Sequence, residues 1–420
     1  MMKRLLFLFF LPLQVLGQNT IGLPDIINYA KPDYKAGLQN WDIKQDKHGI
    51  VYFANNEGLL SFDGKYWNNY PLPNKTIVRS VEIGPDGRIY VGGQDEIGYF
   101  YPGVNGRLQY HSLLELIPAK GRSFGDVWDI VSFKGNTYFR SASKIFKFSD
   151  RSAMVYNAPG EWAFMGQCNG RLYAQDYQSG LLRFENEVWT PVSATNGLPA
   201  GDAVSGIISI NSDSTLVTTL KNGFYCLSGN KITVLESINN ATFKNNRIYG
   251  VTAVNKDWIA LATNNNGVYI TDLKGNIIQS FSRTEGLQNN NVLSVFSDSQ
   301  HNLWLGLDNG IDLITYNSSI KQIKPLLQDG SGYTAILHDN RLYLGTSNGL
   351  FSVVMQPLPD LSFSKGNFSP VNNTRGQTWG LANINNQLLL GHHEGAFVIS
   401  NNNAVPISSN KGFWNFVPLS

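Results

Sequence analysis

A unit of about forty residues recurs nine times along this chain of 420 residues and begins a tenth time near its end. Each unit reads as an apolar run, a polar turn, a run centred on an aromatic residue, a second turn that is often Asn-Gly, and a third run. The clearest copy occupies residues 292–313, and the next occupies 333–351. A chain with this many copies of one short unit must fold as an array in which each copy packs on its neighbours.

The second turn supplies a position on which all nine units can be aligned. It is occupied by Gly58, Gly98, Lys144 (in the glycine's place), Gly180, Gly223, Gly267, Gly310, Gly349 and Gly395. The steps between these positions are 40, 46, 36, 43, 44, 43, 39 and 46 residues, which average about 42. This is the blade length of a β-propeller. We therefore predict an all-β fold, a β-propeller built of four-stranded blades.

The runs within a unit predict its strands. Three short apolar or alternating runs, each ended by Asn, Asp or Gly, indicate three antiparallel strands, and a less regular fourth follows. In the first unit we expect strands at residues 41–45, 50–54, 58–62 and 66–70, and the fourth strand recurs at 187–190. An aromatic residue in the second strand is expected to pack between blades in six units: Tyr52, Tyr90, Tyr138, Tyr173, Trp304 and Tyr343.

Nine units are too many for one seven-bladed ring. We expect units one to seven to close a first ring that ends near Lys321, with residues 26–29 supplying a missing outer strand. The expected organisation is a signal peptide at 1–17, a first propeller at 18–325, and the first blades of an incomplete second propeller at 326–420. The alternatives are a single ring of eight or nine blades, or an open arc.

The N-terminal residues follow the pattern of a secretory signal peptide. Lys3 and Arg4 precede an apolar run over residues 5–16 and the small Gly17, and this run is too short to span a bilayer. We expect cleavage after Gly17 and a periplasmic or secreted protein. Without these two basic residues the 31 remaining Lys and Arg balance the 31 Asp and Glu. A neutral chain lacks the usual attraction to nucleic acid or acidic membranes.

A further recurring position opens the innermost strand, 16 to 19 residues before the turn glycine. Its occupants are Trp41, Arg79, Trp128, Trp162, Ser205, Tyr249, Leu293, Tyr333, Trp379 and, in the tenth unit, Trp414. Inner strands surround the central channel of a propeller, and flat amphipathic rings at its mouth stack well on sugar faces or peptide side chains. The candidate ligand-binding residues are therefore Trp41, Arg79, Trp128, Trp162, Tyr249, Tyr333 and Trp379. The alternative is blade-to-blade packing near the axis.

Signals of catalysis, metal binding or cofactor binding are missing from the sequence. Only residues 392–394 (His-His-Glu) cluster, and we expect adjacent strand residues to face opposite sides, which makes a poor metal site. Asp46, Asp86 and Asp298 recur at the first turn and are expected to form it. Cys168 and Cys226 are expected to be buried free thiols. No catalytic residue, metal or cofactor is predicted.

The connections between units resemble those of a known family. Residues 195–199 (Thr-Asn-Gly-Leu-Pro) precede a strand expected at Val204, and residues 284–291 (Thr-Glu-Gly-Leu-Gln-Asn-Asn-Asn) precede Val292. Gly-Leu, a polar stretch and Val, followed by Asp, Trp or Tyr, Gly and Asn-Gly, closely resembles the two-component regulator propeller repeat. Residues 39–64 are similar to the N-terminal ends of that family. The resemblance runs from about Ile21 to the last residue and is weakest in the units of Lys144 and Gly223.

This resemblance implies the extracytoplasmic sensor region of a bacterial signalling protein. In the family, two seven-bladed propellers typically precede a triple-tyrosine β-sandwich, one membrane helix, and a histidine kinase or a LuxR- or AraC-type DNA-binding domain. The chain stops inside a unit at residues 413–416 without these parts. We therefore expect a fragment of such a protein.

The expected function is recognition of a small-molecule or oligosaccharide ligand, with carbohydrates leading by family analogy, and no enzymatic activity. We expect no nucleic-acid partner for this region and no membrane span in the chain, and dimerisation of the full-length protein is left open. Two alternatives are a secreted propeller enzyme acting on polysaccharide, as a lyase or glycosidase, and a protein-interaction scaffold.

Overall fold

The structure, a computed structural model, describes residues 21–149, 152–193, 197–327, 330–355, 365–408 and 410–418. The chain divides into two compact units, the first spanning Pro24–Ser318 and the second comprising Ser319–Ser420 with the N-terminal residues up to Leu23. The expected signal peptide at residues 1–17 lies outside the described residues. Within the described segments, no helix combines the length and the apolar character that crossing a membrane requires.

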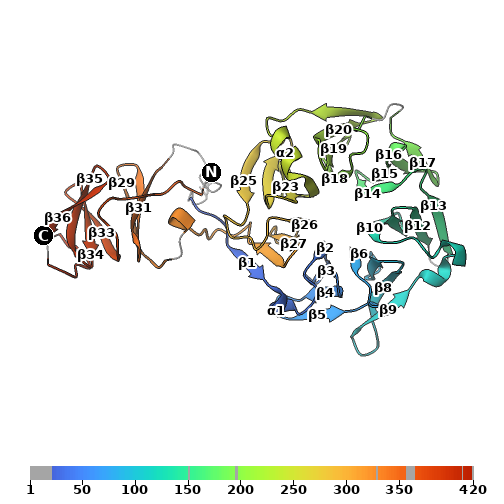
Figure 1. Ribbon diagram of the computed structural model, residues 1–420, viewed down its shortest axis with the longest axis horizontal. Helices are drawn as coiled ribbons and strands as arrows, with labels where there is room; N and C mark the ends of the chain where they lie inside the picture. Colours follow the sequence, from blue (N-terminus) through green and yellow to red (C-terminus); the bar gives the residue numbers. More distant parts are fainter. Residues whose placement is uncertain are drawn as a thin grey trace, which may run out of the picture. The chain divides into compact units, whose positions relative to one another are not determined.

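The first unit is a ring of seven four-stranded antiparallel sheets, or blades (Figure 1). Blade 1 comprises β2 (Asn40–Gln45), β3 (Val51–Asn55), β4 (Gly58–Phe62) and β5 (Trp67–Tyr70). Blade 2 comprises β6 (Val78–Ile83), β7 (Ile89–Gly93), β8 (Ile97–Pro102) and β9 (Leu108–Ser112). Blade 3 comprises β10 (Val127–Phe133), β11 (Asn136–Ser141), β12 (Lys144–Ser149) and β13 (Ser152–Asn157). Blade 4 comprises β14 (Trp162–Cys168), β15 (Arg171–Asp176), β16 (Gly180–Glu185) and β17 (Val188–Pro191).

The ring continues with the same strand order. Blade 5 comprises β18 (Val204–Ser209), β19 (Ser214–Thr219), β20 (Gly223–Ser228) and β21 (Lys231–Leu235). Blade 6 comprises β22 (Ile248–Ala253), β23 (Trp258–Thr263), β24 (Val268–Asp272) and β25 (Ile277–Phe281). Blade 7 takes β26 (Val292–Ser297), β27 (Leu303–Leu307) and β28 (Ile311–Ile314). Short helices join blades: α1 (Lys31–Tyr34), η1 (Leu114–Leu116), η2 (Ala119–Gly121) and α2 (Asn240–Asn246).

The second unit contains two blades of the same kind. Blade 8 comprises β29 (Gly332–His338), β30 (Arg341–Thr346), β31 (Gly349–Val354) and β32 (Ser369–Pro370), preceded by η3 (Pro325–Leu327). Blade 9 comprises β33 (Thr378–Ile384), β34 (Gln387–His392), β35 (Gly395–Ser400) and β36 (Asn403–Ser408). The four strands of blade 1 differ by at most one residue at either end from the predicted ranges.

The seventh blade closes the ring by combining strands from both ends of the first unit. Its outermost strand is β1 (Ile26–Tyr29), which pairs antiparallel with β28, and Ile26 lies opposite Ile314. The inner strands β26 and β2 are also in contact, so the circle is complete (Figure 1). This confirms the predicted outer strand at 26–29 and excludes a single ring of eight or nine blades and an open arc. Closure also removes the free sheet edges that an open array would expose.

The predicted interior positions are buried. The second-strand aromatics Tyr52, Tyr90, Tyr138, Tyr173, Trp304 and Tyr343 are each at most 7% exposed, which confirms them as core residues. The predicted turn aspartates accept backbone N–H bonds, for example from His48 to Asp46 (2.8 Å) and from Gln300 to Asp298 (2.9 Å). Both cysteines are free thiols as predicted, but only Cys168 is buried, whereas Cys226 is half-buried.

In blades 2, 7, 8 and 9 a glycine in the second strand lets the following segment approach closely. A Cβ added to Gly306 of β27 would collide with the backbone oxygen of Asn40, which belongs to the inner strand of blade 1. In blade 9, a Cβ on Gly391 would lie 2.8 Å from the backbone oxygen of Phe413. Residues 413–418 form no strand, yet the backbone of Phe413 occupies the place of a following inner strand. This is where the sequence predicts the start of a tenth unit.

Candidate functional site: the mouth of the central channel

Every inner strand begins with a β-bulge. The pairing of inner and second strands shifts by one residue near its start in all nine blades. The residues skipped by the shift are Trp41, Arg79, Trp128, Ala163, Ser205, Tyr249, Leu293, Tyr333 and Trp379. A bulge leaves its extra residue outside the ladder and re-aims its side chain. A local backbone feature thus sets apart one residue per blade next to the axis.

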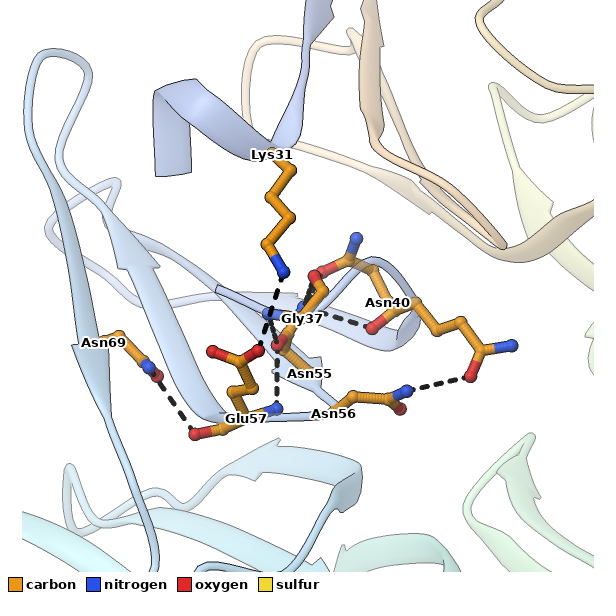
Figure 2. Close-up of polar contacts among 8 residues, drawn as sticks. Lys31, Gly37, Asn40, Asn55, Asn56, Glu57 and Asn69 are labelled. Atoms are coloured by element: carbon orange, nitrogen blue, oxygen red, sulfur yellow. Dashed lines mark hydrogen bonds and ion pairs between the residues drawn. The ribbon is translucent and has the colours of Figure 1, made fainter. Parts of the chain in front are cut away.

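In seven of the nine blades the second strand ends on a buried polar residue that fixes the adjacent turn. In blade 1 the side-chain oxygen of Asn55 accepts the backbone N–H groups of Gly37 and Glu57, both at 2.9 Å, and its amide donates to Asn40 (2.8 Å) (Figure 2). Six other blades place a turn-capping acceptor there: Ser141, Asp176, Thr219, Thr263, Thr346 and His392. Alignment on the turn glycine missed this position because the turns differ in length.

A cavity of about 870 Å³ opens along the axis of the first unit. Its wall contains residues from the inner strands of all seven blades, including Trp41, Arg79, Trp128, Ser205 and Tyr249. This volume is within the range of small-molecule binding sites. The cavity lies at a mouth of the channel, and all seven bulge residues of the first unit, one from each blade, belong to its wall.

Three of these residues form one stack. The Arg79 guanidinium carbon lies 4.0 Å from the centre of the Trp41 ring and 4.7 Å from that of Trp128, and the two indoles meet edge to face at 5.9 Å. Arg79 Nε donates to Asp126 at 3.0 Å, and the Trp41 indole N–H donates to Asn56 at 2.7 Å. The stack joins blades 1, 2 and 3 at the channel mouth.

A loop brings Asp126 to this stack. The Asp95 carboxylate accepts the backbone N–H groups of Phe124 (2.6 Å) and Gly125 (2.7 Å), which holds the end of the segment between β9 and β10. Asp126 also forms an isolated antiparallel bridge with Gln94. Asp126 was missed in the sequence because only this long-range contact shows its proximity to Arg79.

The remaining cations deeper in the wall are each paired with a carboxylate. Lys44 Nζ lies 3.5 Å from Glu82, and Arg140 Nε donates to Asp129 at 2.5 Å. Asp42 accepts the backbone N–H groups of its neighbour in β2 (2.8 Å) and of a residue in β6 (3.1 Å). All three wall cations, Lys44, Arg79 and Arg140, are therefore committed to carboxylates.

Burial and pairing shift the acidity of these groups. Burial raises the pKa of Asp42, and the nearby Lys44 opposes this rise. The Asp42 carboxylate in turn raises the pKa of Lys44, so that its ammonium stays charged. Burial also raises the pKa of Tyr249, which keeps its phenol protonated and able to donate a hydrogen bond. The wall thus offers aromatic surface and polar groups without a free cation among its described residues.

The structure places the predicted Trp162 differently from its counterparts. Trp162 touches the cavity wall but is only 2% exposed, because it packs in a core cluster that contains Tyr138 and Met165. The bulge residue of blade 4 is Ala163. The turn between β14 and β15 has only two residues, Asn169 and Gly170, so this blade has one residue fewer between bulge and capping residue than blade 1.

The other two predicted residues belong to the second unit. Tyr333 is 45% exposed and lines a separate cavity of about 390 Å³ with Leu344 and Phe351. Trp379 stacks on Trp414 with ring centres 4.4 Å apart. The first-unit channel therefore collects Trp41, Arg79, Trp128 and Tyr249 of the candidate set, with Trp162 behind its surface.

The histidine pair of blade 9 serves the structure. The rings of His392 and His393 lie 4.4 Å apart, closer than the strand alternation predicted, because His392 ends its strand. His392 Nδ1 accepts the backbone N–H of Glu394 at 3.2 Å. Within the described segments no group of three or more His, Cys, Asp or Glu side chains is arranged to hold a metal ion.

Comparison with known sequences gives one family match. The model of the two component regulator propeller matches residues 286–309, which include the end of the connection before β26 and the whole of β26 and β27. One unit of this chain thus matches the two-component regulator propeller repeat. The match lies in the unit that closes the seven-bladed ring. No curated protein sequence matches the chain.

Solved structures share the fold of this chain. The extracellular domain of the putative one component system BT4673 from B. thetaiotaomicron matches with a TM-score of 0.55 and 18% identity, over 91% of this chain and 53% of that chain. This chain therefore spans about half the length of that solved extracellular domain. Streptogramin B lyase matches with a TM-score of 0.54 and 16% identity, over 69% of this chain and 96% of its own. The WD40 propeller domain of Doa1 matches with a TM-score of 0.52 and 13% identity, over 70% and 96%. At these identities the likenesses establish the β-propeller fold.

Proposed function

We propose that this chain is the ligand-binding, extracytoplasmic sensor region of a bacterial two-component-type signal transduction protein or transcription regulator. The regulator propeller repeat and the fold shared with an extracellular domain of a one component system support this class. The N-terminal sequence supports export from the cytoplasm. The observation that carries the proposal is the channel-mouth cavity of about 870 Å³, whose wall contains aromatic residues and only paired cations.

The ligand that fits this wall is a carbohydrate or another uncharged small molecule. Indole and phenol rings stack on the apolar faces of sugars, and the phenol of Tyr249 can donate to a hydroxyl oxygen. An anionic ligand would find each wall cation already engaged by a carboxylate. Binding changes the output of a sensor only when one arrangement of the sensor binds more tightly than another.

We further propose that the region has no catalytic activity. The deep carboxylates Asp42, Glu82 and Asp129 are held by cations or backbone N–H groups, which leaves them poorly placed to act as acid and base. The fold is also that of streptogramin B lyase, so a secreted enzyme is the alternative that the experiment must address.

The test is calorimetric titration of the purified chain with neutral and acidic oligosaccharides, each mixture then being analysed for released product. We expect heat of binding with a neutral sugar and no product. Trp128→Ala and Tyr249→Ala should each weaken binding at least tenfold. Tyr101→Ala is the matched control, because Tyr101 is a 45% exposed aromatic on β8 outside the channel. Its affinity should stay at the wild-type value.

Three results would contradict the proposal in different ways. No heat with any sugar rejects the carbohydrate ligand. Binding that survives both aromatic substitutions rejects the channel mouth as the site. Product released by the wild-type protein identifies an enzyme instead of a sensor module.

A further inference from the structure

The cavity at the channel mouth is asymmetric about the axis of the ring. Besides inner-strand residues, its wall includes five residues from loops and turns: Ala142, Glu161, Tyr177, Ala203 and Leu220. These belong to the loops and turns of blades 3, 4 and 5. Among the described residues, the corresponding loops and turns of blades 1, 2, 6 and 7 contribute none to the wall. The cavity therefore extends from the axis outward in one direction, across blade 4.

The sizes of the bulge residues explain this direction. Blades 4 and 5 carry Ala163 and Ser205 at the bulge, whereas the flanking blades 3 and 6 carry Trp128 and Tyr249. The pairing of β14 with β15 skips Ala163, so alanine lies at the mouth while the neighbouring Trp162 packs in the core. The ring of large side chains is thus interrupted by a gap two blades wide with an aromatic residue on either side.

The outer part of the gap has the chemistry of a hydroxyl-binding surface. Tyr177 is 39% exposed, and burial together with the nearby Glu161 raises its pKa, so its phenol remains a hydrogen-bond donor. Glu161 is exposed and has no ion-pair partner among the described residues, so its carboxylate is available as an acceptor. A donor and an acceptor beside an aromatic face suit a polyhydroxylated, uncharged chain.

We infer that the ligand is a linear, uncharged oligosaccharide that lies with one end at the channel axis and runs outward through the gap at Ala163 and Ser205. The inner sugar unit of this oligosaccharide contacts Trp128 and Tyr249, and its outer sugar units lie along Tyr177 and Glu161. This inference rests on the proposed sensor function and adds the shape of the ligand and the path it follows. A single sugar ring would leave the outer part of the cavity unused.

The experiment compares sugars of different length on the same variants. Calorimetric titrations use the monosaccharide, disaccharide and hexasaccharide of neutral glucan, mannan, galactan and arabinan series, with oligogalacturonate as the anionic probe. For the wild-type protein, the hexasaccharide of the recognised series should bind at least tenfold more tightly than its monosaccharide. Ala163→Trp should fill the gap and cancel this gain, whereas Ala163→Ser, the matched control, should preserve it.

A second variant, Tyr177→Ala, tests the same inference if Ala163→Trp does not fold. Tyr177→Ala changes a partly exposed side chain after β15 and should also cancel the gain with length, while monosaccharide affinity stays within twofold of the wild type. Equal affinities for monosaccharide and hexasaccharide, or a gain that survives both substitutions, overturn the radial path but leave the sensor function standing. Preference for oligogalacturonate overturns the uncharged ligand. Absence of binding to every probe rejects the carbohydrate ligand, and this inference fails with it.

Discussion

The guanidinium carbon of Arg79 lies 4.0 Å from the centre of the Trp41 indole ring. A cation over an aromatic face is attracted by the negative potential of that face, and Arg79 uses a second indole, that of Trp128, in the same way. Because the three residues come from three consecutive blades, their contacts hold the channel mouth together. The same stack shapes the proposed ligand site.

Replacing Arg79 should therefore loosen the ring as well as the site. Arg79→Ala removes two cation–π contacts and the ion pair with Asp126, and should lower the free energy of unfolding by about 2 kcal/mol. Arg79→Lys keeps the charge but loses the planar guanidinium group, so its free energy of unfolding should lie between those of Arg79→Ala and the wild type. Thermal unfolding of the three proteins checks this. Identical transitions for Arg79→Ala and the wild type would show that the stack contributes nothing.

Removal of Tyr29 should weaken the ring closure. Tyr29 ends β1 and stacks on Trp304 of blade 7 at 5.9 Å while its ring edge meets Trp67 of blade 1 at 5.3 Å. Tyr29→Ala should cost about 2–3 kcal/mol of unfolding free energy, since it deletes a large aromatic between two blades. The control is Ile27→Thr in the same strand, where the side chain is exposed and strand propensity is kept. Urea unfolding distinguishes them, and equal midpoints would refute the role of Tyr29.

A methyl group on Gly306 should not be tolerated. Its Cβ would collide with the Asn40 backbone of the next blade, which cannot move without opening the ring. Gly306→Ala should lower the free energy of unfolding by about 2 kcal/mol or more. Gly250→Ala provides the control, because the nearest atom to its added Cβ is the Ala262 methyl at 3.9 Å. Equal melting temperatures of Gly306→Ala and Gly250→Ala would show that the close approach of the blades does not require glycine at position 306.

Mild acid should loosen blade 9. Burial, aided by the neighbouring His393 and opposed by Glu394, lowers the pKa of His392 below its usual value of 6.5. The folded state therefore favours the neutral imidazole of His392, whereas the unfolded chain takes up a proton near pH 6.5. The free energy of unfolding is therefore unaffected by this group above pH 6.5 and falls as the pH drops below 6.5. Between pH 7.5 and 5.5 the opening free energy of β34 should fall by about 1 kcal/mol, measured by amide hydrogen exchange with the intrinsic rates corrected for pH.

The matched substitution for this site comes from the other blades. Thr219, Thr263 and Thr346 accept the turn N–H at the position of His392. His392→Thr should keep that acceptor and abolish the pH dependence of β34 exchange. A pH dependence that persists in His392→Thr would assign it to another group.

Most of the fold could be predicted because its signals are local. Strand alternation, turn residues and an aromatic in the second strand recur in each unit, and the missing outer strand at 26–29 follows from counting strands in the seventh. The half-buried Cys226 was predicted less well, since its burial depends on how the neighbouring strand packs and the sequence pattern of its own strand does not reveal this.

The candidate site was predicted only in part because a bulge breaks the strand alternation. Counting back from the turn glycine cannot tell whether Trp162 or Ala163 is the bulge residue, because the spacing between the bulge and this turn position differs from blade to blade, for example 16 residues in blade 3 and 19 in blade 2. A shift of one position along the strand moves a side chain from the core to the channel. Asp126, Glu161 and Tyr177 lie in connecting segments whose approach to the channel depends on contacts between blades.

The strand that closes the ring also governs when the ring can form. Ile26 pairs with Ile314, so about 290 residues must be synthesised between the two, which takes roughly 15–60 seconds at ordinary rates of translation. Until then β1 is an unpaired strand and blade 7 lacks its outer edge. Because an unpaired strand edge is a template for pairing with another chain, late ring closure leaves this edge open to aggregation while the chain is being made.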